Sequence, residues 1–276
     1  MIGHVLAIAR TELRLGIRNR WVLLATLMLL TFALVLGLIG TAPTGTLATA
    51  RLVVTLASLA TLSVYLVPLI ALLVSFDAIA GEVDRGTLPI LLATPVSRTA
   101  VVLGKFLGHL VVIALAVTIG YGVASGVILA LSGGTLAEAE PLLALIGLSI
   151  LLGAAFLGVG YAVSVLGGSV GTAAALAVGT RLVAAVLCDL ALLGALVAAP
   201  ESFFAKTLSP YLLLTNPADA FRLFALSDLD IGGAATGFAG VAQGLPLPPV
   251  AALASLILWT AMALAAAALA IRRIQP

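Results

Sequence analysis

Residues 67–109 read VPLIALLVSFDAIAGEVDRGTLPILLATPVSRTAVVLGKFLGH and contain the sharpest change of character in the chain. An apolar run ends abruptly, and within nine positions the chain places Asp77, Glu82, Asp84 and Arg85. The apolar run at 88–92 that follows is too short to cross a bilayer. Arg98 and Lys105 then lead into another long apolar segment. The stretch therefore predicts two membrane spans joined by a charged loop.

The loop itself covers residues 77–99. Gly81 and Gly86 permit sharp turns in it, and its apolar run at 88–92 is best read as a short helix or turn. Such an element would present leucine side chains to another protein. The alternative is an ordinary solvated loop.

The composition of the whole chain is that of a membrane protein. Of its 276 residues 63% are hydrophobic and 9% are charged, and the mean hydropathy is +1.30, whereas a soluble domain carries about 25% charge. A membrane span needs about 20 apolar residues. We therefore predict one all-α transmembrane domain, 1–276, with six spans, at 21–40, 52–76, 100–131, 142–166, 172–199 and 250–271.

The distribution of basic residues predicts the orientation, because cytoplasmic connections are rich in Lys and Arg. With the N-terminus inside, the cytoplasmic segments hold nine basic residues: Arg10, Arg14, Arg18, Arg20, Arg85, Arg98, Lys105, Arg272 and Arg273. The outer segments hold three: Arg51, Lys206 and Arg222. We expect a multi-pass protein of the bacterial inner membrane with both termini in the cytoplasm.

Residues 1–20 have the pattern of an amphipathic helix. Apolar residues recur at intervals of three and four, and a basic stripe runs beside them at Arg10, Arg14 and Arg18. We predict a cytoplasmic helix at the level of the lipid headgroups. The alternatives are a basic flank that only fixes the topology and a docking surface for a partner.

Small residues are spaced for close helix packing at four places, Gly104/Gly108, Gly122/Gly126, Ala154/Gly158 and Gly160/Ser164/Gly168. We expect a tight bundle and allow for a dimer.

Two charged residues, Arg181 and Asp189, interrupt the apolar fifth span. Charges at this depth usually face a protein interior or a water-filled cavity. Arg181 is close enough to the cytoplasmic side to extend its side chain to the membrane surface, whereas Asp189 is deeper and is the better functional candidate. The two are about 12 Å apart along a helix, so a direct pair within the span is unfavourable.

The outer segment, 200–249, is the one sizeable connection outside the spans. Asn216 and Pro217 have the pattern of an N-cap followed by proline at the first helical position, and Asp219 lies in the first turn. Together with Arg222, these residues predict a short amphipathic helix in a partly re-entrant outer gate. After Ser227 we expect an irregular loop.

The sequence lacks the motifs of an enzyme. It has no Gly-rich loop followed by Lys and Ser or Thr, and no histidine pair at helical spacing. The soft metal ligands amount to Cys188, Met1, Met28 and Met262, so a copper-conducting pore is not expected. We predict no catalytic residues, no metal or cofactor bound by this chain, and no nucleic-acid partner. An intramembrane enzyme using Asp189 and His109, and a non-transport scaffold, are the alternatives from other classes.

The charged loop resembles a known family. Similar residues form the cytoplasmic loop of type-2 ABC exporter permeases, in which a coupling helix docks on the ATPase subunit: Gly81-Glu82, Arg85-Gly86-Thr87-Leu88, Leu91-Leu92, Pro95-Val96-Ser97-Arg98 and Gly104-Lys105. Four segments resemble NosY-type permeases more narrowly: RTELRLGIRNRW, FDAIAGEVDRGTLPILL, GKFLGH and LLLTNPADAFRL. NosY-type permeases are the membrane subunits of NosDFY transporters, which serve maturation of the copper sites of nitrous oxide reductase.

The resemblance implies a fold, partners and site residues. It implies the type-2 ABC exporter permease fold and a homodimer flanked by NosF-type ATPases that hold ATP and Mg, with a NosD-type periplasmic β-helical protein outside. By this resemblance the ATPase contact comprises Glu82, Arg85, Gly86, Thr87 and Leu88, and the outer interface comprises Asn216, Pro217, Asp219 and Arg222. The remaining alternative within transporters is an exporter permease for a lipid, drug or polysaccharide.

Overall fold

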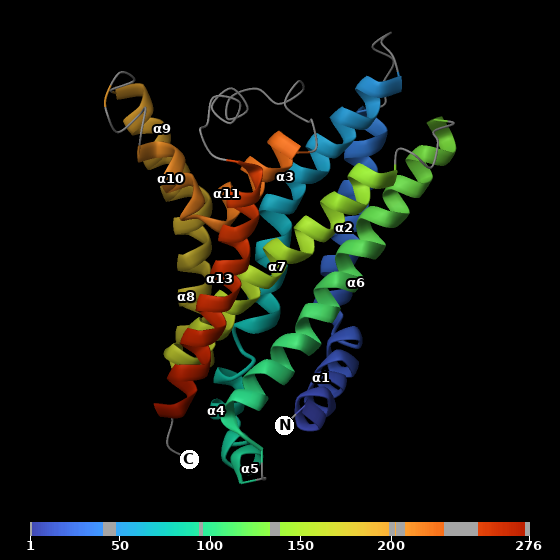
Figure 1. The fold of residues 1–276 in the computed structure, drawn as a ribbon. Helices are drawn as coiled ribbons and strands as arrows, with labels where there is room; N and C mark the ends of the chain where they lie inside the picture. Colours follow the sequence, from blue (N-terminus) through green and yellow to red (C-terminus); the bar gives the residue numbers. More distant parts are fainter. Residues whose placement is uncertain are drawn as a thin grey trace.

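The computed structural model describes residues 2–40, 48–93, 96–132, 139–198, 202, 208–228 and 248–273. Within these residues every regular element is a helix, which confirms the all-α prediction. Figure 1 shows long, tilted helices that run side by side between two ends of the molecule. The irregular loop predicted after Ser227, and Lys206 of the outer segment, lie outside the described residues.

The long helices match the six predicted spans. Their bounds are α2 Arg20–Gly40, α3 Ala48–Ser75, α6 Arg98–Ser132, α7 Ala139–Gly167, α8 Val170–Leu182 with α9 Cys188–Ala198, and α13 Pro249–Ala270. Five helical segments of the described chain are long and apolar enough to cross a membrane on their own. The short helix α1 (Ile2–Ile17) and α2 pass the same test of length and composition only as a pair, and this pair is bent by 67°.

The short elements gather at the two ends of the bundle. The first end, here called the loop end, holds α1, α4 (Ala80–Asp84), α5 (Leu88–Leu92) and both chain termini (Figure 1). The opposite end, here called the hairpin end, holds α10 (Ser209–Leu214) and α11 (Pro217–Asp228). Both termini lie at the loop end, as an even number of spans requires (Figure 1).

The core is formed by α3, α6 and α7. Ser63 of α3 forms hydrogen bonds with the hydroxyl of Tyr121 in α6, at 2.7 Å, and with that of Ser149 in α7, at 2.9 Å. These buried hydroxyls satisfy one another in an otherwise apolar interior, so they fix the register of the three helices. By contrast, only 11% of the most apolar part of the fifth span is buried, against 67% for α6.

Two of the predicted close-packing positions hold α1 against α6. An ideal Cβ added to Gly104 would lie 2.7 Å from the Cβ of Ile8, and one added to Gly108 would lie 2.7 Å from the carbonyl oxygen of Ala9. Only glycine therefore allows this approach of the two helices. Gly122 and Gly126, in contrast, have nothing within 4 Å of an added Cβ.

The sequence predicts one continuous fifth span, but the structure interrupts its α-helix. A π-helical turn, η2 (Val183–Leu187), separates α8 from α9. The carbonyl oxygen of Ala184 in this turn accepts a 2.7 Å hydrogen bond from the side-chain amide of Asn216. The wider turn thus supplies a backbone acceptor to another element, and π-turns of this kind are frequent at functional sites.

Candidate functional sites at the two ends of the bundle

The helix α4 of the charged loop is tied to two neighbouring helices. The hydroxyl oxygen of Ser164 in α7 accepts hydrogen bonds from the backbone amides of Ile79 and Ala80, each at 3.0 Å. The carboxylate of Asp84 accepts from the amide of Val170, at the start of α8, at 2.9 Å. Hydrogen bonds thus join the α4 region to the C-terminal part of α7 and to the start of α8.

After α4 the chain turns sharply at Gly86. Its φ of 68° lies in the left-handed region, which glycine adopts without steric cost. The hydroxyl of Thr87 donates to the carbonyl oxygen of Glu82 at 3.3 Å and closes this turn. The short helix predicted at 88–92 follows as α5.

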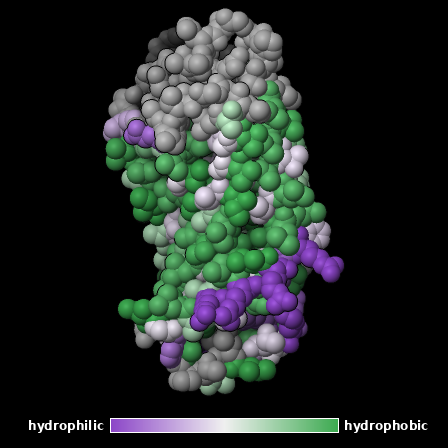
Figure 2. Space-filling model, turned by 90° about the vertical axis from the view of Figure 1, so that its right-hand side faces the viewer, coloured by the Kyte–Doolittle hydropathy of each residue, from purple (hydrophilic) through white to green (hydrophobic). Residues whose placement is uncertain are grey.

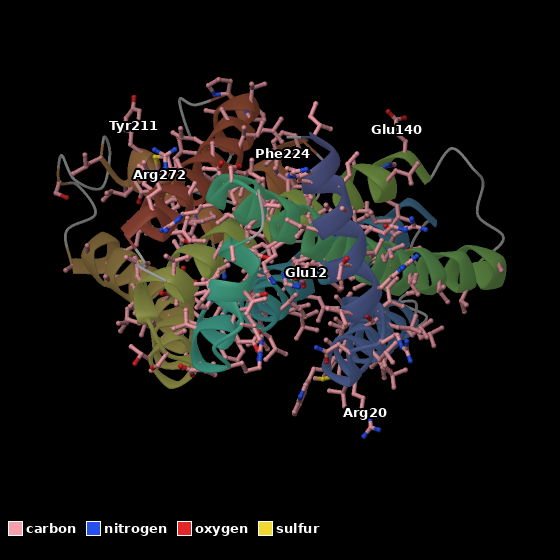
Figure 3. All side chains as sticks on the ribbon, turned by 90° about the horizontal axis from the view of Figure 1, so that it is seen from below. Glu12, Arg20, Glu140, Tyr211, Phe224 and Arg272 are labelled. Atoms are coloured by element: carbon pink, nitrogen blue, oxygen red, sulfur yellow. The ribbon has the colours of Figure 1, made fainter. Side chains whose placement is uncertain are left out.

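A buried lysine joins the charged loop to the N-terminal helix. Lys105 of α6 is only 5% exposed, and its ammonium group forms ion pairs with Glu82 of α4, at 2.7 Å, and with Glu12 of α1. One cation thus holds carboxylates from two segments that are far apart in the sequence. Figure 3 shows Glu12 directed into the bundle at the loop end.

The same cluster extends into α7 through a histidine. The imidazole Nε2 of His109 lies 3.4 Å from Glu12, and its Nδ1 forms a 2.7 Å hydrogen bond with the hydroxyl of Tyr161. Burial opposes ionisation of Glu12, but the hydrogen bond from His109 and the charge of Lys105 outweigh it and lower its pKa to about 2. Glu12 is therefore a fixed negative charge at cellular pH.

The predicted contact residues of the loop divide into two groups. Arg85, Gly86 and Thr87 are exposed at the tip of the loop. Glu82 points inward to Lys105, and Leu88 is 2% exposed and packs in the core of the protein itself. The expectation that Leu88 is presented to a partner is therefore wrong; Ile90, which is 70% exposed, is a large apolar residue of α5 that does face outward.

At the hairpin end, α10 and α11 form a helical hairpin whose turn reaches back to the fifth span. The side-chain oxygen of Asn216 accepts a hydrogen bond from the amide of Ala218 at 3.1 Å, and α11 begins at Pro217, which confirms the predicted cap. The amide nitrogen of Asn216 donates to Ala184 and, at 2.8 Å, to the carboxylate of Asp219. This contact joins the hairpin to the π-turn of the fifth span.

The intramembrane Asp189 finds its partner in this hairpin. Arg222 donates to Asp189 at 2.8 Å and to Asp219 at 2.9 Å, so one guanidinium joins α9 to α11. One oxygen of Asp189, Oδ1, is buried without a hydrogen-bond partner. The pair explains how a carboxylate is accommodated in an apolar span.

Arg181 does not extend toward the membrane surface, and that expectation is wrong. Its guanidinium donates to the carbonyl oxygens of Val64 and Tyr65, at 3.0 and 3.1 Å, and lies 5.9 Å from the centre of the Tyr65 ring. Val64 is eleven residues from the end of α3, or about 16 Å along the helix axis. Arg181 therefore ties α8 to the middle of α3.

Four polar residues that form one buried cluster at the loop end were not among the predicted site residues: Glu12, Lys105, His109 and Tyr161. A signal existed for one, because Glu12 is the only acidic residue among the first twenty. His109 is buried, and its imidazole lies between Glu12 and Tyr161. His109 lies with Glu12 at the loop end, whereas Asp189 pairs with Arg222 of the hairpin. The structure therefore does not bring together the two residues on which the enzyme alternative depended.

Comparisons with known proteins agree with this architecture. The model of the ABC-2 family transporter proteins matches residues 6–273. A probable ABC transporter permease protein NosY of Pseudomonas aeruginosa (strain PAO1) is 41% identical over 269 residues, which cover 95% of this chain and 96% of the relative. A protein of the same description from Stutzerimonas stutzeri is 39% identical over 276 residues, covering 99% of each chain.

Proposed function

We propose a function that proceeds from one premise: the chain belongs to the ABC-2 family of transporter proteins and is the permease subunit of an ABC transporter. In this proposal a separate cytoplasmic ATPase, which holds ATP and Mg, docks on the charged loop. The loop end then faces the cytoplasm, in keeping with the nine basic residues predicted on that side. ATP hydrolysis moves the loop, and the bundle carries the movement to the hairpin end.

The observation that carries this proposal is the attachment of the loop. The exposed tip of the loop, with Arg85 and Thr87, can contact a partner, while Glu82 forms an ion pair with the buried Lys105. Through that lysine the loop is joined to α1 and α6, and through Ser164 it is joined to α7. A loop that served only as a connection would not need buried charges, because burying an ion pair costs solvation free energy.

At the hairpin end, we propose that the α10–α11 hairpin responds to this movement. The ion pair of Arg222 with Asp189 and the hydrogen bond of Asn216 to the π-turn couple the hairpin to the fifth span. A NosD-type protein would dock on this side, with Asn216, Pro217, Asp219 and Arg222 near the interface. Because Asn216 and Asp219 are buried, we propose that they control the motion of the hairpin and do not contact the NosD-type protein directly.

We further propose that the transporter serves maturation of the copper sites of nitrous oxide reductase, as the similarity to NosY proteins suggests. A mechanical role fits better than passage of copper. The described thioethers and the thiol, Met28, Met262 and Cys188, belong to three different helices and are exposed on the outside of the bundle. Soft metals are handled by such ligands when they converge.

A homodimer is part of the proposal. The fifth span is largely unburied within one chain, and Tyr65 beside it is also exposed. We expect a second copy, accompanied by its own NosF-type ATPase, to pack along this side.

The charge of the loop tip provides the test. Arg85→Glu should leave the permease folded, because Arg85 is exposed, and should abolish the stimulation of ATP turnover by the permease in the reconstituted complex. Arg272→Glu, at the same end but outside the loop, is the matched control and should retain it. Normal stimulation with Arg85→Glu would remove the loop from the ATPase contact.

A further inference from the structure

A basic stripe runs along the outer side of α1. Arg10 and Arg14 lie about one helical turn apart on α1, Arg18 follows directly after its last residue, and all three are exposed. Figure 2 shows the strongly hydrophilic residues gathered in a band across the part of the molecule occupied by this helix. Arg20, at the start of α2, points away from the bundle near the same place (Figure 3).

An apolar stripe lies next to the basic one. Ile2, Leu6 and Ile17 are each about half exposed or more, and helical spacing places them on the side of α1 adjacent to the arginines. The bend of 67° between α1 and α2 directs α1 sideways from the span. A helix with this division of faces lies in the plane of the membrane surface, with its apolar side in the acyl region and its basic side among the headgroups.

The third side of α1 is fixed to the protein. Gly104 and Gly108 admit the helix to van der Waals contact with α6, and Glu12 projects from this side to Lys105. Lys105 in turn holds Glu82 of the charged loop. The position of α1 at the membrane surface is therefore linked, through one buried cation, to the position of the loop.

We propose that the basic stripe of α1 binds the headgroups of anionic phospholipids, and that this contact sets how firmly Glu12 and Glu82 share Lys105. Anionic lipid then acts as a positive regulator of coupling between the loop and the bundle. The regulatory part rests on the proposed function, whereas the lipid site does not.

An acidic protein surface is the competing occupant of a basic stripe. Charge complementarity would suit either, but the neighbouring exposed apolar stripe favours lipid. Ile2, Leu6 and Ile17 would be left in water if α1 stood away from the membrane to meet a soluble partner. Each basic side chain at an anionic surface strengthens binding roughly fivefold, so three in one stripe suffice for enrichment of anionic lipid.

Trp21 reports directly on this site. It is exposed and follows the stripe, and Trp259 is the second of the two tryptophans of the chain. The Trp259→Phe variant of the full chain is reconstituted in vesicles of equal parts phosphatidylcholine and phosphatidylglycerol, with bromine on the acyl chains of one lipid or of the other. We expect Trp21 fluorescence to be quenched more strongly by the brominated phosphatidylglycerol.

Matched variants assign the effect to the stripe. The combined Arg10→Gln, Arg14→Gln and Arg18→Gln variant should equalise quenching by the two lipids, whereas Arg272→Gln should leave the difference intact. Equal quenching in the parent protein, or a difference that survives the triple variant, would overturn the lipid site. Loss of the co-purifying ATPase in the triple variant, with the quenching difference unchanged, would assign the stripe to the protein partner.

ATP turnover tests the regulatory part separately. In the reconstituted complex we expect turnover to be several-fold higher with phosphatidylglycerol present than in phosphatidylcholine alone, and the triple variant to lose this difference. Turnover that is high but independent of lipid would refute regulation. A complex without turnover in any lipid would refute the proposed function, and the quenching result would still decide the lipid site.

Discussion

Replacing Lys105 by methionine tests the ion pairs that link the charged loop to α1. Methionine keeps the length of the side chain and removes its charge, so Glu12 and Glu82 lose their common cation. At the observed 2.7 Å separation, the attraction between Lys105 and Glu82 alone is about 6 kcal/mol at an effective dielectric constant of about 20. The solvation lost on burial offsets part of this, and removing one partner of a buried pair typically costs about 3–5 kcal/mol.

We therefore expect Lys105→Met to lower the free energy of unfolding by about 3–5 kcal/mol, measured by titration with a denaturing detergent in mild micelles. Glu82→Gln should cost less, because Lys105 and Glu12 remain a balanced pair and one oxygen of Glu82, Oε2, has no partner. The double variant should be less destabilised than the sum of the two by about 0.5–3 kcal/mol. Strictly additive losses of unfolding free energy, or a loss below about 1 kcal/mol for Lys105→Met, would refute the claim that Lys105 links Glu12 and Glu82.

Three further predictions concern the packing of α1, the contact of Ser164 with the charged loop, and the hairpin. Gly108→Val should displace α1 and cost about 1–3 kcal/mol, because an ideal Cβ lies 2.6 Å from Glu12 and 2.7 Å from Ala9, whereas Gly122→Ala, with open space, should be neutral in the same unfolding titration. Ser164→Ala removes the acceptor of two buried amides of the loop and should cost about 1–3 kcal/mol while reducing permease-stimulated ATP turnover; unchanged turnover would exclude this contact from coupling. Asp189→Asn should destabilise the fold more than Asp84→Asn in the same titration, because Asp189 pairs with a guanidinium and Asp84 only with an exposed backbone amide. Equal effects of the two variants would contradict the assigned pair.

The spans, the short helix within the charged loop and the cap of α11 follow from local sequence. Hydropathy determines where a helix can cross a membrane, and the Asn216-Pro217 pair sets the start of α11 through its own backbone. The pairing of Lys105 with Glu12 could not be predicted in this way, because the two residues are ninety-three positions apart and meet only after α1 has packed on α6.

In the fifth span, too, the sequence indicates the unusual residues but not their tertiary contacts. Arg181 and Asp189 were recognised as unusual from sequence, but their partners were not, because a carbonyl of α3 and a guanidinium of α11 are supplied by tertiary structure. The π-turn between them also leaves no mark in composition. It widens the backbone where Asn216 enters, a contact that depends on how the hairpin folds back.

Purification of the chain in mild detergent from its native membrane tests the central claim most directly. The account predicts that an ATP-hydrolysing subunit co-purifies with the chain, that its turnover depends on the permease, and that Arg85→Glu releases it while Arg272→Glu does not. A chain that purifies without any ATPase, or that retains one equally in both variants, would contradict the claim that this loop receives the work of ATP hydrolysis.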